Sequence, residues 1–205
     1  FHPAWGAFKK KVEGIGKIHA IAATNRGQCP GGWFVEEELS GGGAMIDHTV
    51  HVADLIRDLL RGDRLRGDLL GGEPTRVEAS RSSALYGRAT DDCALLTLDY
   101  EGSIYATLDA SWSRPTGYRT WGDVTMRVTG EAGVAELDLF GPAIQVTSAS
   151  RARDLAIGSD VDALMVDAFI RAVLDSDPVV TTLEDGLAAS RVAIAAYASA
   201  PALVG

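Results

Sequence analysis

The sequence contains little cysteine, no long apolar run and no initial methionine. Its two cysteines, Cys29 and Cys93, match neither a CxxC pair nor a zinc-ribbon spacing. We therefore expect two reduced thiols rather than a disulfide, which favours a cytoplasmic protein. No apolar stretch is long enough to span a bilayer, and the first residues, FHPAWGAFKKK, lack the apolar segment of a secretory signal. Because the chain begins abruptly at Phe1, we expect a fragment of a longer protein, or a processed or trimmed chain.

Positive charge is scarce as well. The 205 residues include 19 Lys and Arg against 28 Asp and Glu, which gives a net charge of -9, and the lone basic run at 9–11 is short. Nucleic acids and anionic membranes attract concentrated basic surfaces, so neither is an expected partner. A hydrophobic content of 46% is ample for the core of one globular domain, which we place at residues 1–205.

The order of the hydrophobic patterns predicts an α+β fold. Helices are predicted at 4–13, 160–175 and 183–200, and a further helix is predicted within the stretch 40–60, after its three glycines; one strand is predicted at 17–24. Alternating apolar residues predict further strands at 76–85, 92–100, 103–112, 123–129, 134–139 and 143–147. Their short connections, most clearly the hairpin at 100–103, favour antiparallel pairing. We expect a mainly antiparallel sheet of about six strands with helices packed on one face.

A sheet that helices cover on one side has a second, open face. This face must meet solvent, a partner subunit or another domain. Tyr100, Tyr105 and Trp112 are candidates to lie on it. The sequence does not distinguish among the three environments.

The stretch at 40–60, SGGGAMIDHTVHVADLIRDLL, is the most informative part of the chain. Its helical period places Asp47, His51, Asp54 and Asp58 along one polar stripe. Ser40 is suited to cap the helix, and any chemistry is expected on the polar stripe. The opposite, core-facing stripe consists of Met45, Thr49, Val52, Ile56 and Leu59.

Asp47 and His51 form an acid/base pair in outline. They lie one helical turn apart, so the carboxylate can orient the imidazole and raise its basicity. Such an imidazole can take the proton of an alcohol that is oxidised to a carbonyl, or return it. Spacing alone favours an ordinary solvated face, because D-x-x-x-H is a weak pattern. The three glycines before the helix, Gly41 to Gly43, favour the catalytic interpretation, because the backbone there can approach a ligand closely and offer it free N–H groups. Gly42 and Gly43 are therefore candidate substrate-binding residues.

A metal site is the competing chemical interpretation. Asp47, His48 and His51 resemble a partial ligand set, but His48 is predicted to lie well around the helix from the other two. No third histidine or nearby cysteine completes a shell, so no metal is expected. The chain also contains no GxSxG elbow, P-loop or GxGxxG fingerprint, and no cofactor-binding residue can be assigned within it.

The chain resembles the C-terminal domain of the Gfo/Idh/MocA oxidoreductases, the family of glucose-fructose oxidoreductase and inositol dehydrogenase. The resemblance rests on FHPAWGAFKK with GIGKI, the central SGGGAMIDHTVHVADLIRDLL, the hairpin DYEGSIYATLDASW, the turn VTGEAGVAELD and the closing LEDGLAASRVAIAAYASA. It implies an open-faced sheet of the dihydrodipicolinate-reductase-like kind. In the family a Rossmann domain that binds NAD or NADP precedes this domain, and that domain is not in these 205 residues.

The same resemblance implies roles for individual residues. Asp47 and His51 match the family's aspartate and histidine: His51 would accept the proton of a substrate hydroxyl, and Asp47 would orient or polarise the group. The lysine of the family's E-K-P segment belongs upstream of Phe1. Asn25, Arg26 and Trp33 fall where the family has a variable substrate-contacting loop.

The resemblance implies an NAD(P)-dependent dehydrogenase that oxidises a hydroxyl of a sugar, inositol or related polyol to a ketone. This chain would be its substrate-binding domain, would form a homo-oligomer through the open sheet face, and would be inactive and cofactor-free alone. Two alternatives stay open. One is a non-catalytic binding or regulatory relative, against which the presence of both Asp47 and His51 speaks. The other is an NAD-recycling glycoside hydrolase, which nothing in the sequence separates from a dehydrogenase.

Overall fold

The structure is a computed structural model that describes residues 1–61, 72–141, 143–147, 152–156 and 160–203. Its main element is a six-stranded sheet with the strand order β2-β3-β4-β1-β5-β6. The strands are β1 (Ile18–Gly27), β2 (Arg76–Ser82), β3 (Cys93–Tyr100), β4 (Ile104–Ser111), β5 (Gly122–Gly130) and β6 (Gly133–Asp138).

Five neighbouring pairs build this sheet, and only the central pair, β1 and β4, is parallel. The predicted antiparallel meander therefore holds for β2–β3–β4 and for β5–β6, but β1 lies between these two groups. The predicted hairpin at 100–103 is confirmed: β3 and β4 are joined by the short helix η3 (Glu101–Ser103), in which Gly102 has a φ of 71°. Such a left-handed conformation suits glycine.

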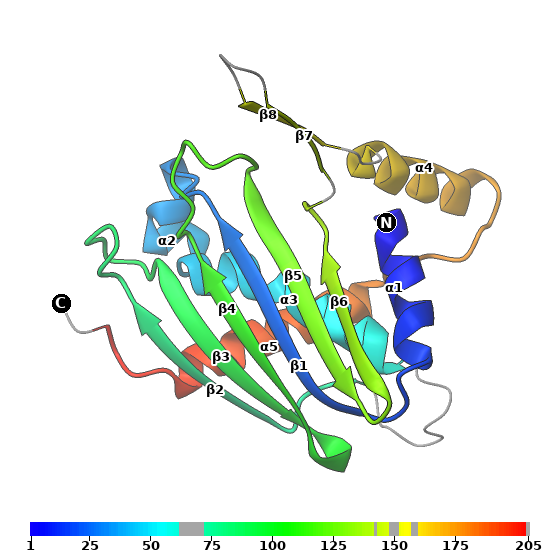
Figure 1. Cartoon of the computed structure of the whole chain (residues 1–205). Coiled ribbons are helices and arrows are strands. Elements are labelled where there is room, and N and C mark those ends of the chain that lie inside the picture. The colour runs from blue at the N-terminus through cyan, green and yellow to red at the C-terminus, as the bar shows by residue number, and fades with distance from the viewer. Residues whose placement is uncertain (62–71, 142, 148–151, 157–159, 204–205) are drawn as a thin grey trace.

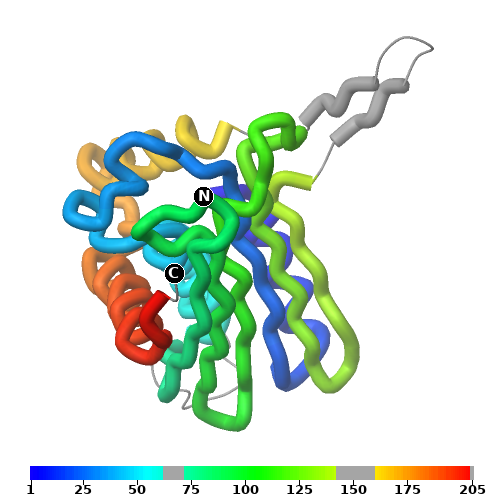
Figure 2. The backbone as a smooth tube through the Cα atoms, turned by 90° about the vertical axis from the view of Figure 1, so that its left-hand side faces the viewer, coloured from blue at the N-terminus to red at the C-terminus, as the bar shows by residue number. Residues whose placement is uncertain are grey.

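The helices are α1 (Pro3–Glu13), α2 (Glu37–Ser40), α3 (Ala44–Arg61), α4 (Val161–Leu174) and α5 (Leu183–Ser199), with a short η1 (Gly32–Val35). In Figure 1, α3 and α5 lie behind the sheet, and Figure 2 shows its other face uncovered. The α+β class and the covering of one face are thus as predicted. All five residues of the predicted core-facing stripe of α3 are buried: Met45, Thr49, Val52, Ile56 and Leu59.

Strand alternation decides which aromatic residues reach the open face. Tyr105 lies there and is 51% exposed. Trp112 and Tyr100 are buried on the helix side, so their predicted placement is wrong. Side chains alternate between the two faces along a strand, so every second residue faces the helices. Trp112 follows the inward-facing Ala110 of β4 by two residues, and Tyr100 follows the inward-facing Leu98 of β3 by two.

The region after β6 departs most from the prediction. The predicted strand β7 (Ala143–Thr147) exists, but it pairs with an unpredicted strand, β8 (Ala152–Ala156), in a separate two-stranded sheet. Helix α4 has no buried residue and lies away from the main sheet in Figure 1. Both cysteines are free thiols, as predicted. Among the described residues, no helix combines the length and the apolar character that crossing a membrane requires.

Candidate functional site

Helix α3 is fixed at its start by Asp91, which precedes β3. The carboxylate Oδ2 of Asp91 accepts the N–H of Met45 (2.7 Å), and its backbone carbonyl accepts the N–H of Ala44 (2.9 Å). The hydroxyl of Tyr197, on α5, donates to the other carboxylate oxygen (2.5 Å). Ser40 instead donates to the carbonyl of Gly42 (2.6 Å). The prediction that Ser40 caps α3 is therefore wrong, because the cap comes from a segment distant in sequence.

The glycines before α3 allow close packing. A Cβ on Gly43 would overlap the carbonyl oxygen of Asp91, and a Cβ on Gly42 would overlap the hydroxyl of Tyr197. The N–H of Gly43 donates to that hydroxyl (3.0 Å). Because the N–H groups of Gly43, Ala44 and Met45 already have partners inside the protein, the predicted free donors for a ligand do not exist there. The reason for assigning Gly42 and Gly43 to substrate binding therefore fails.

Asp47 lies on α3 with its side chain 20% exposed. The indole N–H of Trp112 donates to its Oδ2 (2.9 Å), and Nε2 of His48 lies 3.2 Å from the same oxygen. Burial raises the pKa of Asp47, but the contacts with His48 and Trp112 and the charges of His48 and His51 outweigh it, so that the pKa is lowered. Asp47 is therefore an ionised carboxylate at neutral pH.

His48 is buried, as expected for a residue well around the helix from the polar stripe. Its imidazole nevertheless contacts Asp47. Its Nδ1 is 2.8 Å from the carbonyl oxygen of Asn25, and the amide of Asn25 donates to the carbonyl of His48 (3.0 Å). A Cβ on Gly27 would lie 2.8 Å from Cε1 of His48, so the end of β1 has a glycine where the imidazole packs.

His51 is exposed on the polar stripe of α3. The surrounding protein nevertheless removes part of its hydration, and this desolvation lowers the pKa of His51. The charge of His48 lowers the pKa further, whereas Asp47 and Asp54 raise it, and the net change is downward. The imidazole is therefore neutral near pH 7 and can accept a proton, since the ordinary pKa of histidine is about 6.5.

The other two residues of the polar stripe differ from this pair. Asp58 accepts the indole N–H of Trp5 (2.6 Å) and an N–H of Lys9 (2.8 Å), so it fastens α1 to α3. Burial, and then the charge of Asp58, raise the pKa of Asp54. Both carboxylates line a hollow of about 440 Å³ beside α3.

The predicted substrate-contacting residues are divided between the two faces of the sheet. Asn25 lies on the helix side and reaches Asp47 through His48. Its neighbour Arg26 lies on the open face, where it pairs with Asp109 (2.7 Å), and so it does not join this site. Trp33 is exposed and stacks on Phe34. A role for Trp33 in binding substrate stays a prediction.

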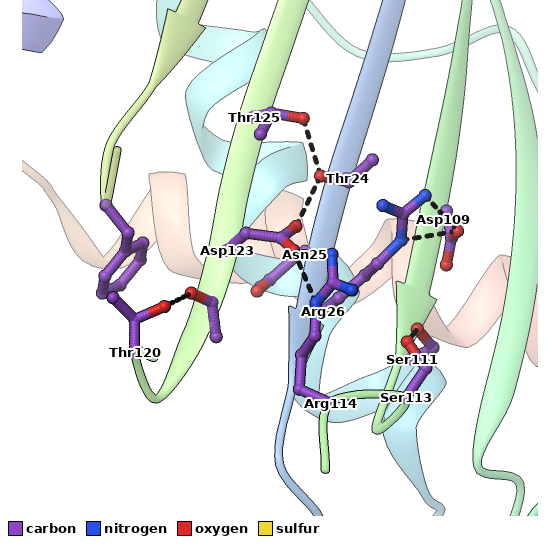
Figure 3. A network of polar contacts seen from close by, with 12 residues as sticks. Thr24, Asn25, Arg26, Asp109, Ser111, Ser113, Arg114, Thr120, Asp123 and Thr125 are labelled. Atoms are coloured by element: carbon purple, nitrogen blue, oxygen red, sulfur yellow. Dashed lines mark hydrogen bonds and ion pairs between the residues drawn. The ribbon is translucent and has the colours of Figure 1, made fainter. Parts of the chain in front are cut away.

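The open face has its own polar network, which Figure 3 shows beside the ends of β1, β4 and β5. The hydroxyl of Thr24 donates to Asp123 (2.9 Å) and shares a hydrogen bond with Thr125 (2.7 Å). Arg114 also donates to Asp123 through Nε (2.7 Å). Among the described residues, no group of three or more His, Cys, Asp and Glu side chains is arranged to hold a metal ion.

Solved structures with this fold belong to larger proteins. GenD2 from gentamicin A biosynthesis, in complex with NAD, superposes with a TM-score of 0.81 at 21% identity, over 97% of this chain and 58% of that one. Myo-inositol 2-dehydrogenase from Lactobacillus plantarum gives 0.72 at 21% identity, over 96% and 59%. Levoglucosan dehydrogenase, in complex with NADH and levoglucosan, gives 0.70 at 17% identity, over 94% and 59%. The chain thus spans somewhat more than half the length of these proteins.

No curated protein matches the chain. The sequence profile of the GFO/IDH/MocA C-terminal domain matches residues 11–136, which is more than half of this chain and includes α3, β1 to β5 and part of β6. The chain therefore belongs to the GFO/IDH/MocA family, as its C-terminal domain.

Proposed function

We propose that this chain is the substrate-binding domain of an NAD(P)-dependent oxidoreductase that oxidises a hydroxyl of a sugar, inositol or related polyol to a ketone. A Rossmann domain outside these 205 residues would bind the cofactor. Family membership supports the general reaction. The structural neighbours named as a myo-inositol 2-dehydrogenase and a levoglucosan dehydrogenase favour a cyclic polyol or sugar as the substrate.

The observation that carries this proposal is the polar stripe of α3. His51 is exposed, its pKa is lowered, and the ionised Asp47 lies one helical turn before it. A neutral imidazole beside a carboxylate is suited to receive a proton, because the carboxylate stabilises the imidazolium that forms. A general base must be able to reach the substrate, and His51 can do so from the exposed side of the helix.

In the proposed reaction His51 removes the hydroxyl proton of the substrate. The carbon that carries the hydroxyl gives up its hydrogen with the electron pair of the C–H bond, as a hydride, and the C–O group becomes a ketone. A nicotinamide supplies the hydride acceptor when it is bound. Asp47 stabilises the charged form of His51 during the step, and in the reverse direction His51 returns the proton to the carbonyl oxygen.

Two measurements test the division of roles between this chain and the rest of the protein. Titration calorimetry of the 205-residue chain with NAD+ and with NADP+ should give no detectable binding. The full-length protein should reduce one of the two cofactors when supplied with cyclic polyols and sugars. Submicromolar cofactor binding by the chain alone would contradict the division, and a full-length protein that oxidises none of these alcohols would contradict the reaction.

We also propose that two copies of the chain associate through the open sheet face. Tyr105 and Leu95 are both more than half exposed on that face, and Leu95 lies opposite Asp109, one of the paired residues of Figure 3. Light scattering after size-exclusion chromatography should show a homo-oligomer that Tyr105→Asp disrupts. Ile194→Asp, which changes an apolar residue on α5 that is even more exposed than Tyr105, should leave the oligomer intact. A monomeric protein, or equal effects of the two changes, would contradict this proposal.

A further inference from the structure

His48 lies between two oxygen atoms inside the protein. It is 1% exposed, with Nδ1 2.8 Å from the carbonyl oxygen of Asn25 and Nε2 3.2 Å from Oδ2 of Asp47. A carbonyl oxygen can only accept a hydrogen bond, so Nδ1 carries a proton. With Asp47 ionised, a bare Nε2 would face a carboxylate oxygen without any hydrogen between them. Two acceptors at that distance repel each other, and the repulsion is strong in a buried setting.

We propose that His48 is a positioning residue that carries an N–H on both ring nitrogens and holds Oδ2 of Asp47 in place for the proposed reaction of His51. Its catalytic consequence rests on the proposed function, but the protonation of His48 does not. The 3.2 Å between Nε2 and Oδ2 is the distance of an ion pair, and Nε2 makes no aligned hydrogen bond within the described part of the chain.

The carboxylate of Asp47 is held from one side only. Trp112 and His48 both contact Oδ2, whereas Oδ1 has no hydrogen-bond partner within the described part of the chain. The side chain is 20% exposed. The contacts from inside the protein therefore hold Oδ2 and leave Oδ1 free to interact on the polar stripe of α3, where His51 lies one turn further along the helix.

The residues that contact Oδ2 are both connected to the two central strands of the sheet. Trp112 directly follows β4, and His48 is tied to Asn25 on β1. These strands form the parallel pair of the sheet, with Asn25 opposite Ala110. Rigid strands thus support both contacts to Oδ2 of Asp47, which is how a supporting residue limits the motion of a reactive group.

The charge of His48 also acts on His51. It lowers the pKa of His51, whereas the charge of Asp47 raises it. A carboxylate alone would favour an imidazolium at His51, which cannot accept a proton. A charged His48 offsets part of that effect, which favours the neutral imidazole of His51 in the resting state.

Two substitutions in the full-length protein separate the two contacts of His48. In His48→Gln the side-chain amide can place an N–H near the position of Nε2 and so keep a donor to Asp47. In His48→Asn it can place an N–H near the position of Nδ1, which keeps the contact with Asn25 but loses Asp47. We expect His48→Asn to lower kcat about 10- to 100-fold, because the N–H that faces the charged carboxylate is lost, with a smaller change in KM. His48→Gln should stay within about fivefold of the original kcat.

Equal losses in the two variants, or a greater loss in His48→Gln, would overturn the positioning role. A second measurement needs neither activity nor a substitution. In 15N-histidine NMR spectra of the unsubstituted protein at neutral pH, His48 should show two ring N–H groups protected from solvent exchange. A single N–H, on Nδ1 alone, would overturn the proposal. If the full-length protein oxidised no alcohol, the proposed function would fail, while the spectrum would still decide the state of His48.

Discussion

Replacing Asp91 by alanine should release the N-terminus of α3. Asp91 is buried, and its carboxylate accepts the N–H of Met45 and the hydroxyl of Tyr197. Loss of a helix-capping acceptor costs about 0.5–2 kcal/mol. The hydroxyl of the half-buried Tyr197, left without its acceptor, adds a cost of about 1–3 kcal/mol. The free energy of unfolding should therefore fall by about 3 kcal/mol, which is a large share of the stability of an ordinary domain.

Equilibrium urea denaturation, followed by circular dichroism, measures this loss. The slope of the unfolding free energy with urea should stay unchanged, since the native and unfolded states keep their exposed areas. Asp91→Asn keeps an acceptor oxygen without its charge and should give an intermediate loss. Asp99→Ala, which removes an exposed carboxylate 3.7 Å from Arg76, is the matched control and should cost less than about 1 kcal/mol. A loss for Asp91→Ala no larger than that of the control would refute the role assigned to Asp91.

Three further changes test other parts of the site. Trp112→Phe removes the N–H that donates to Asp47 and some buried volume, so thermal denaturation should show a loss of about 1–3 kcal/mol in the free energy of unfolding. The kcat should fall as well, and an unchanged kcat would mean that Trp112 does not support Asp47. Asp58→Asn weakens the contacts of α3 with Trp5 and Lys9 and should lower the free energy of unfolding by about 0.5–1.5 kcal/mol in the same assay. A stabilised variant would contradict the role of Asp58 in holding α1 against α3. The pKa of His51 is lowered in the folded state, so the unfolded chain takes up a proton first as the pH falls. His51 therefore contributes stability above about pH 6.5 that is lost below it. His51→Gln should therefore show a shallower loss of stability between about pH 7 and pH 5, and a steeper one would contradict the direction of the pKa change.

Local periodicity was enough to predict the buried face of α3 and the β3–β4 hairpin. The spacing of Met45, Val52 and Ile56 identified the buried side of α3, and glycine at position 102 marked the β3–β4 hairpin. These features depend on residues close in sequence, where the helical and strand repeats act directly. Recognition of Asp47 and His51 as an acid/base candidate came from the same repeat and from the family resemblance.

Contacts between distant segments were beyond the sequence patterns. Nothing near α3 indicates that Asp91 caps it or that Tyr197 closes over Gly43, because both partners come from other elements. His48 was set aside because adjacent helical residues diverge by about 100° around the axis, yet its imidazole still reaches Oδ2 of Asp47. The only available signals were Asn25 and Gly27 at the end of β1, and their meaning depends on the position of β1 beneath α3.

The central claim is that His51 is the acid/base of the proposed dehydrogenase, and His51→Ala in the full-length protein tests it most directly. The measurement is single-turnover hydride transfer at saturating substrate, together with the dissociation constant of the cofactor. The rate should fall about 10²- to 10⁴-fold, as for the loss of a general base, while cofactor affinity is unchanged. Asp54→Asn, one turn further along the same stripe, is the control and should change the rate far less. A His51→Ala enzyme that keeps its rate within about threefold, or that loses cofactor affinity as much as rate, would contradict the claim.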